Sequence, residues 1–414
     1  MSRVLIITQN FYPEIGSAAN RIKNIYKELT NEGYEVKVLT TDPKYPNRNI
    51  YKDSEYWNEE ELENDVIRIT TNVRRYSNNI FNRFFLYLEM MVKFNRAIAR
   101  LDGNFDFVIA TTPAIFVGLT GLNAKKKFQC PLILDVRDLW PDSLVGVGVF
   151  TFKPIISMAG LLEKKLYHGS DNIIINSEGF LPHIIDQGIS NEKISFMPNS
   201  LTEDELLNKT DKVQVPNDKV TIIYTGNIGL AQDVNQLIDI AERMKHRSNV
   251  HFKIIGYGYR SKELRERLRE KKILNVDFVR PKNRREATEA TRTADIAYVS
   301  LVNQKVFDTV LPGKIVDYMC MGKPIVGAVS GYAADTILRA ECGYISLERQ
   351  TDEICEYIEK LVDDPELRNT FGENGYKFAT RHYSWNKNIV VLTRLLEPKY
   401  GKESVHVRME PLHK

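Results

Sequence analysis

The sequence predicts an α/β protein of two domains, each a parallel β-sheet covered by helices. The chain has 414 residues, which is too long for one ordinary hydrophobic core and suits about two domains. Short apolar strands alternate with helical patterns along its length, as is typical of parallel sheets. The alternation weakens once, in a polar stretch at 206–218, and this stretch predicts an interdomain linker.

The first domain is expected to span residues 1–205. Its predicted strands are short apolar segments, and they lie at 4–8, 35–39, 106–110, 132–136 and 172–176. Helical patterns follow them, the clearest at 18–31 and 81–101. A last helix, within 383–400, is expected to cross back onto this domain.

The second domain is expected at 219–382. Its predicted strands lie at 220–224, 251–255, 276–279, 296–299 and 325–329. Its predicted helices lie at 233–245, 261–271, 284–293, 313–321, 352–362 and 365–380. Ligands of such sheets bind beyond the carboxyl ends of the strands, so the strand-to-helix loops are where we expect the functional residues.

Composition favours a soluble cytoplasmic protein. A net charge of +3 is too small to indicate a nucleic-acid partner. The four cysteines form no CxxC pair and suit buried free thiols in a reducing compartment. The N-terminal segment is typical of a first strand rather than a signal peptide, and no apolar run reaches the ~20 residues that span a bilayer. The seven histidines are scattered and no DxD motif occurs, so no metal or other cofactor is expected.

The segment 307–324, FDTVLPGKIVDYMCMGKP, carries the strongest functional signal. Leu311 and Pro312 form a turn with the next glycine. A helix then begins near Lys314, and Asp317 follows three residues later. The first turn of a helix offers free backbone N–H groups, to which a lysine adds a charge for phosphate. A carboxylate can accept hydrogen bonds from two ribose hydroxyls. The segment therefore predicts a nucleotide-diphosphate site.

Three glycine-containing loops follow other strands. Gly16 and Ser17 precede the first helix, where a phosphate or a sugar can approach backbone amides. The loop TGNIG at 225–229 contains Gly226 and Asn227, and GYG at 256–258 follows the next strand; its ends, Gly256 and Gly258, permit close approach of a ligand. A tight turn explains each loop as well as a ligand does.

The loop after the strand at 132–136 reads DVRDLWPD and contains Arg137 and Asp138. Its place at a strand end favours a catalytic or acceptor-binding role. The alternative is a structural ion pair, in which Arg137 binds Asp135 or Asp138. In the second domain, basic residues also lie in loops, and one or two of them could hold a diphosphate; the candidates besides Lys314 are Arg280, Lys282 and Lys305.

The segment 81–101 is too apolar for an ordinary surface helix. It contains Phe84, Phe85, Met90 and Met91 beside several arginines and lysines. This composition suits a helix that lies on an anionic membrane surface. Burial between the sheet and a neighbouring helix explains it equally well.

Together these motifs resemble the GT-B-fold glycosyltransferases of family GT4. The resemblance covers nearly the whole chain and is greatest to the bacterial branch that contains the WbuB-like L-fucosamine transferases of O-antigen and capsule synthesis. The motifs that carry it are FYPEIGSAANR, DVRDLWPDS, PNS at 198–200, TGNIGLAQ and TVLPGKIVDYMCMGKPI. It implies two Rossmann-like domains that face each other across a cleft, with the donor mainly in the second and the acceptor mainly in the first.

The resemblance implies roles for individual residues. The family has two glutamates eight residues apart that contact the donor sugar and the ribose; here they are Thr309 and Asp317. Asp317 keeps the ribose role with a shorter side chain, and Thr309 can only donate a hydrogen bond to the donor sugar. The candidate catalytic residues are thus Thr309 with Arg137 and Asp138, where Arg137 replaces a family histidine and Asp138 orients the acceptor or Arg137.

Two family cations of the donor phosphate site are also replaced. An arginine and a lysine in the loop after TG become Asn227 and Gln232. The phosphate charge must then be met by Lys314, Arg280, Lys282 or Lys305.

The expected function is retaining, metal-independent transfer of a sugar from a UDP-sugar to a lipid-linked or glycan acceptor in bacterial surface polysaccharide synthesis. N-acetyl-L-fucosamine or another N-acetylated deoxysugar fits the resemblance. The expected location is the inner face of the cytoplasmic membrane, on anionic lipid. Two alternatives remain: a UDP-sugar 2-epimerase with the same fold, and a non-catalytic partner of a polysaccharide assembly complex.

Overall fold

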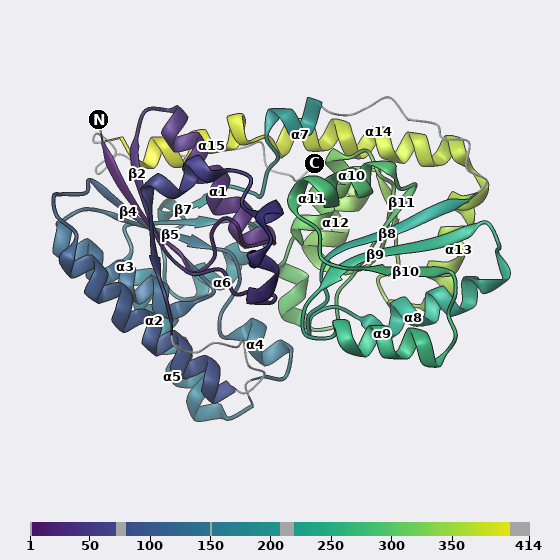
Figure 1. Ribbon diagram of the computed structural model, residues 1–414, viewed down its shortest axis with the longest axis horizontal. Coiled ribbons are helices and arrows are strands. Elements are labelled where there is room, and N and C mark those ends of the chain that lie inside the picture. Colours follow the sequence, from purple (N-terminus) through teal and green to yellow (C-terminus); the bar gives the residue numbers. More distant parts are fainter. Residues whose placement is uncertain (1, 72–79, 150, 208–218, 398–414) are drawn as a thin grey trace. The chain divides into compact units, whose positions relative to one another are not determined.

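The computed structural model describes residues 2–71, 80–149, 151–207 and 219–397 (Figure 1). The chain forms two compact units. The first contains residues 1–14, 18–198 and 385–414, and the second contains 15–17 and 199–384.

The first unit is built on a seven-stranded sheet in the order β3-β2-β1-β4-β5-β6-β7, and every neighbouring pair is parallel. Along the chain the strands are β1 (Arg3–Ile7), β2 (Glu35–Thr41), β3 (Val66–Ile69), β4 (Phe107–Thr111), β5 (Leu132–Val136), β6 (Asn172–Ile175) and β7 (Ile194–Phe196). The central strands β4 and β5 are buried at every position, because helices cover both faces of the sheet.

The helices of the first unit connect these strands. They are α1 (Ser17–Asn31), α2 (Ile80–Arg100), α3 (Ile115–Phe128), α4 (Asp142–Gly146), α5 (Lys153–Gly169) and α6 (Leu181–Asp186). The last helix of the chain, α15 (Trp385–Leu395), packs into the core of this unit, where Trp385, Ile389 and Leu392 join side chains of β1 and α1.

The second unit has a six-stranded parallel sheet in the order β10-β9-β8-β11-β12-β13. The strands are β8 (Val220–Asn227), β9 (Val250–Tyr257), β10 (Val276–Val279), β11 (Ile296–Ser300), β12 (Ile325–Ala328) and β13 (Gly343–Ile345). The helices are α7 (Glu203–Leu207), α8 (Val234–Arg243), α9 (Ser261–Glu270), α10 (Arg284–Thr293), α11 (Gly313–Cys320), α12 (Gly331–Arg339), α13 (Thr351–Asp363) and α14 (Pro365–His382), and a short 3₁₀ helix, η7 (Lys305–Thr309), precedes α11.

The predicted fold class is confirmed, because both units are parallel sheets covered by helices. Sequence reasoning missed the edge strands β3, β7 and β13 and the helix α12, all of which are short. The compact units divide at 198/199 rather than near 205. Of the predicted linker, Leu206 is buried in α7, and 208–218 lie outside the described residues.

The helix predicted at 81–101 is α2. Met90 is only 1% exposed and packs in the core, so the prediction that it contacts a membrane is wrong. Met91 is half-buried, Phe85 is exposed, and the side chain of Phe84 lies outside the described residues. In the part of the chain that the structure describes, no helix is both long and apolar enough to cross a bilayer.

Candidate functional site

Lys314 of the second unit carries a buried amino group. It lies in the first turn of α11, which follows Pro312 and has no side-chain cap. Its Nζ is buried and has no hydrogen-bond partner among the described residues. Burial lowers the pKa of Lys314 to about 7, although the Asp317 carboxylate acts in the opposite direction. A buried ammonium without a partner is costly, so this position is built for an anion that the chain itself does not supply.

The end of β8 holds Lys314 in place. The Nζ atom lies 3.5 Å from the ring centroid of Tyr224, a cation–π contact that stabilises the charge in the absence of a hydrogen bond. The Tyr318 hydroxyl of α11 accepts a hydrogen bond of 2.9 Å from the backbone N–H of Thr225. Gly226 has a φ of 104°, and a Cβ there would lie 4.0 Å from Lys314 Cε. The start of α11 is therefore fixed beside the carboxyl end of β8.

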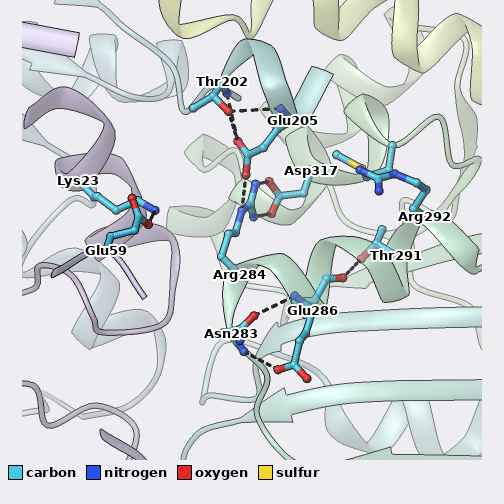
Figure 2. Close-up of polar contacts among 12 residues, drawn as sticks. Lys23, Glu59, Thr202, Glu205, Asn283, Arg284, Glu286, Thr291, Arg292 and Asp317 are labelled. Atoms are coloured by element: carbon cyan, nitrogen blue, oxygen red, sulfur yellow. Dashed lines mark hydrogen bonds and ion pairs between the residues drawn. The ribbon is translucent and has the colours of Figure 1, made fainter. Parts of the chain in front are cut away.

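Asp317 is held by an arginine that sequence reasoning did not connect to it. Arg284 of α10 binds both oxygens of Asp317, at 2.9 and 2.8 Å, and donates through Nε to Glu205 of α7 at 2.8 Å (Figure 2). Burial lowers the pKa of Arg284, but the two carboxylates outweigh it and raise that pKa well above its usual value. Each Asp317 oxygen keeps a further lone pair, so the fixed carboxylate can still accept from a ligand hydroxyl.

Thr309 lies at the end of η7, and its hydroxyl donates to the carbonyl of Val306 at 2.7 Å. Its neighbour Asp308 accepts a hydrogen bond from Ser330, which in turn accepts from Arg349 at 2.7 Å. Sequence reasoning missed this chain of contacts, because the three residues come from separate loops and no local motif connects them.

The arginine of that chain also donates from Nε to the carbonyl of Leu301, at 2.9 Å. It therefore joins the loops that follow β11, β12 and β13. The segment from η7 to α11 belongs to the connection after β11, so Arg349 joins it to the loops after β12 and β13.

The glycine loops of the second unit are shaped by their own packing. The Gln232 side chain accepts from the N–H of Gly229 at 2.8 Å and closes the turn after β8. A Cβ at Gly256 would lie 2.1 Å from the side chain of Ile228, and one at Gly258, where φ is 129°, would lie 2.3 Å from Asn227 Oδ1. Close approach of the chain to itself thus accounts for these glycines, as the turn interpretation expects.

The other predicted phosphate cations differ from Lys314. Arg280 and Lys305 are exposed, and Lys282 is paired with Glu286. Among these candidates, only Lys314 carries a buried nitrogen that lacks a partner in the described part of the chain.

Gly16 and Ser17, the two candidate residues of the loop at 9–17, belong to the second unit. Residues 15–17 pack with that unit, and Ser17 Oγ accepts a hydrogen bond of 3.3 Å from Asn199. Gly16 has a φ of 126°, which favours glycine at the turn before α1.

Leu311, in the turn before α11, has a buried side chain.

In the first unit, the loop after β5 starts from a buried ion pair. Arg21 of α1 binds Asp135 through Nε, at 3.1 Å to each oxygen, and through Nη2 at 2.8 Å. Both side chains are almost wholly buried. Arg21 also donates to the carbonyl of Pro198 at 3.1 Å. In the described residues no ion pair joins Arg137 to Asp135 or to Asp138, so the alternative of a structural ion pair at Arg137 is wrong; the partner of Asp135 is Arg21.

Arg137 and Asp138 follow that pair. Arg137 Nε is buried and has no hydrogen-bond partner among the described residues, and burial lowers the pKa of Arg137 to about 10. Burial raises the pKa of Asp138 to about 6, against the effect of a hydrogen bond from Ser143. Two ionisable groups with displaced pKa values at a strand end are typical of a functional site.

Replacing Asp138 with asparagine is expected to remove a pH dependence of stability. Because the folded-state pKa is raised, the native state gains stability as pH falls from about 6 towards 4. The variant should lose that gain and be more stable than the parent at pH 7, by about 1–3 kcal/mol. Urea unfolding at pH 4, 5, 6 and 7 measures it. Asp102→Asn, at an exposed position of the same unit, is the control; equal pH profiles for Asp138→Asn and the parent would contradict the assignment.

No metal centre is visible in the described ranges. Within them, no group of three or more histidine, cysteine, aspartate or glutamate side chains could hold an ion. The four cysteines are free thiols.

Two family models match the chain. The model "Glycosyl transferase 4-like domain" matches residues 16–200, and "Glycosyl transferases group 1" matches 208–378. The matches divide near the boundary between the two compact units, and the second contains Lys314, Arg284 and Asp317.

Known proteins similar to the chain agree with these models. It is 23% identical to WcaI of Escherichia coli K12, named as a colanic acid biosynthesis glycosyl transferase, over 80% of this chain and 84% of that protein. It is 25% identical to the capsular polysaccharide biosynthesis glycosyltransferase CapM of Staphylococcus aureus, over 69% of this chain and 76% of that protein. The structure of Anabaena HepE in complex with UDP and glucose has a TM-score of 0.67 and 15% identity, over 96% of this chain and 99% of that one. The chain is therefore a glycosyltransferase of group 1 with the GT-B fold.

Proposed function

We propose that the protein transfers a sugar from a UDP-sugar, with retention and without a metal, to a lipid-linked or glycan acceptor in bacterial surface polysaccharide synthesis. The observation that carries the donor part is the buried, unpartnered ammonium of Lys314 at the start of α11. The relatives named for colanic acid and capsule biosynthesis support the polysaccharide, and N-acetyl-L-fucosamine or another N-acetylated deoxysugar is the sugar we propose.

The chemistry follows from where charge develops. As the bond between the sugar and the diphosphate breaks, negative charge grows on the leaving oxygen. Lys314 and the free N–H groups of the first turn of α11 stabilise it. The departing phosphate oxygen takes the proton of the acceptor hydroxyl, since Thr309 offers no carboxylate. Asp138, in the first unit, orients the acceptor or Arg137.

Asp317 is proposed to accept hydrogen bonds from the two ribose hydroxyls. A short aspartate must be held at the right place for this, and the bidentate contact with Arg284 holds it. Arg284 is thus a positioning residue, because it acts on the ribose through Asp317.

Arg284→Met is expected to weaken UDP binding about tenfold and to leave the binding of inorganic pyrophosphate unchanged. Pyrophosphate has no ribose, so it reports only on the Lys314 end of the site. Calorimetry with both ligands measures the difference, and Arg285→Met, at the next and exposed position of α10, is the control. If both ligands weaken equally, Arg284 does not act through the ribose.

The function itself is tested with a panel of nucleotide sugars. Thermal unfolding with UDP, ADP and several UDP-sugars should show a shift for the UDP series, since a ligand that binds the native state raises its stability. A positive UDP-sugar is then incubated with the protein alone. Rapid isomerisation without an acceptor would identify a 2-epimerase instead. The absence of any nucleotide binding would favour a non-catalytic assembly partner.

A further inference from the structure

We infer that the outer face of α5 is a docking surface for anionic lipid. The α5 apolar face consists of four large hydrophobic side chains: Phe152, just before the helix, and Ile155, Met158 and Leu161 within it. They are 63%, 42%, 56% and 67% exposed. Such side chains are normally scattered singly on a protein surface, so four of them along one helix indicate a surface that contacts something apolar.

The helix geometry separates this face from the core. Ile155, Met158 and Leu161 follow one another at three-residue spacing, and each step turns about 60° around the helix, so these three side chains share one broad face. Phe152 precedes the helix and extends the apolar surface at its N-terminal end. Glu163 and Tyr167 lie on the side of the helix opposite Met158 and Leu161 and are buried. A helix with one buried face normally carries mostly polar residues on the opposite face, whereas α5 carries Met158 and Leu161 there beside two lysines. Figure 1 shows α5 at the edge of the first unit.

The charged side chains of α5 indicate what kind of partner its apolar face contacts. Lys153, Lys164 and Lys165 are exposed on α5. Its one acidic residue, Glu163, is buried and accepts a hydrogen bond of 2.8 Å from Tyr167. The accessible charge of the helix is therefore wholly positive. An apolar stripe flanked by lysines matches a bilayer with anionic headgroups. A second copy of the chain fits less well, since a symmetric contact would bring the same lysines together.

The alternative helix, α2, carries less of this pattern. Among its described side chains, only Phe85 and Val92 are large exposed hydrophobics. Leu86, Met90, Phe94 and Ile98 are buried, and Lys93 is paired with Glu89. The membrane contact that the sequence suggested for α2 is thus better placed on α5. This inference rests on the proposed function only for its purpose, which is to bring the enzyme to a lipid-linked acceptor.

Vesicle flotation tests the surface. The parent protein is expected to float with vesicles of phosphatidylcholine containing about a third phosphatidylglycerol, and much less with phosphatidylcholine alone. The double variant Met158→Ser/Leu161→Ser should reduce the bound fraction at least tenfold. Leu274→Ser, at an 89% exposed position of the second unit, is the matched control and should change nothing. Phe85→Ser should have a small effect.

A second pair of variants tests the charge. Lys164→Glu/Lys165→Glu should weaken flotation with the anionic vesicles severalfold, whereas Lys262→Glu, also on an exposed helix, should not. Unchanged thermal unfolding shows that these surface variants are folded.

Three results would overturn the inference: a parent that does not float, an α5 double variant that floats like the parent, or a dimer that the double variant converts to a monomer in size-exclusion chromatography. UDP binding is measured on the same samples. A protein that floats but binds no UDP would refute the proposed donor and leave the docking surface standing.

Discussion

Lys314→Met is expected to weaken UDP binding about a hundredfold without destabilising the ligand-free protein. The ammonium is buried, has no hydrogen-bond partner among the described residues and lies over the face of Tyr224. A charged contact to phosphate contributes about 1.5–3 kcal/mol, which gives the expected loss of affinity. Removing an unpaired buried charge should raise the free energy of unfolding by about 1 kcal/mol, after loss of the cation–π contact is subtracted.

Lys314 should also make the affinity for UDP depend on pH. Because its pKa is about 7 in the free protein, Lys314 is mostly neutral above that pH and must take up a proton when the diphosphate binds. UDP affinity should therefore fall by up to tenfold per pH unit above about 7 in the parent, and this slope should vanish in Lys314→Met. Titration calorimetry at pH 7, 8 and 9 measures it. Lys305→Met, at an exposed lysine of the preceding turn, should keep both affinity and slope.

Lys314 would not be the phosphate ligand if its methionine variant bound UDP as the parent does. A variant that lost binding together with several kcal/mol of stability would instead assign it a structural role.

Arg21→Met is expected to destabilise the first unit by about 3–5 kcal/mol. The guanidinium is the partner of Asp135, and both groups are inaccessible to water. Removing one member of a buried pair leaves the other charge buried without compensation, which is more costly than the pair is stabilising. Chemical denaturation, followed by a probe in the first unit such as Trp385 fluorescence, measures the change.

The double variant Arg21→Met/Asp135→Asn separates charge from packing. It should recover more than half of the lost stability, because no unpaired charge remains. Arg137→Met is the matched control: it removes a guanidinium whose buried Nε has no hydrogen-bond partner among the described residues, and it should cost far less. If Arg21→Met were nearly neutral, the pair would be hydrated, and the loop after β5 would have no buried electrostatic anchor.

Much of the candidate donor site could be predicted from the sequence, because it is local. The turn, the lysine and the acid of segment 307–324 lie within one helix start, and the spacing alone puts them near one another. The partners of these residues were not predictable. Arg284 is 33 positions from Asp317 in the chain, and no pattern in the sequence distinguishes it from the exposed Arg285 beside it.

The wrong predictions for Arg137 and Met90 have the same cause: contacts between residues distant in the chain are not visible in the sequence. The carboxylate of Asp135 in DVRDLWPD could be assigned to Arg137 because the two are only two positions apart, but its partner lies 114 positions away in α1. Composition groups Met90 with Phe85 of α2, because it does not show which face of an amphipathic helix meets the core. The exposed apolar face of α5 is not predictable from the sequence, since its side chains have the composition of core residues and only the packing of the opposite face shows which side meets the solvent.

The sequence by itself determined the two parallel sheets, the order of most of their strands and helices, and the helix start that carries Lys314. These follow from hydrophobic periodicity and helix-start chemistry, which involve neighbours a few residues apart. Only the tertiary structure decided which charges are compensated and which apolar faces are covered. Lys314 has no hydrogen-bond partner among the described residues, Asp317 is held by Arg284, and α5 exposes an apolar face. Each outcome depends on residues that are far apart in the chain and close together in the fold.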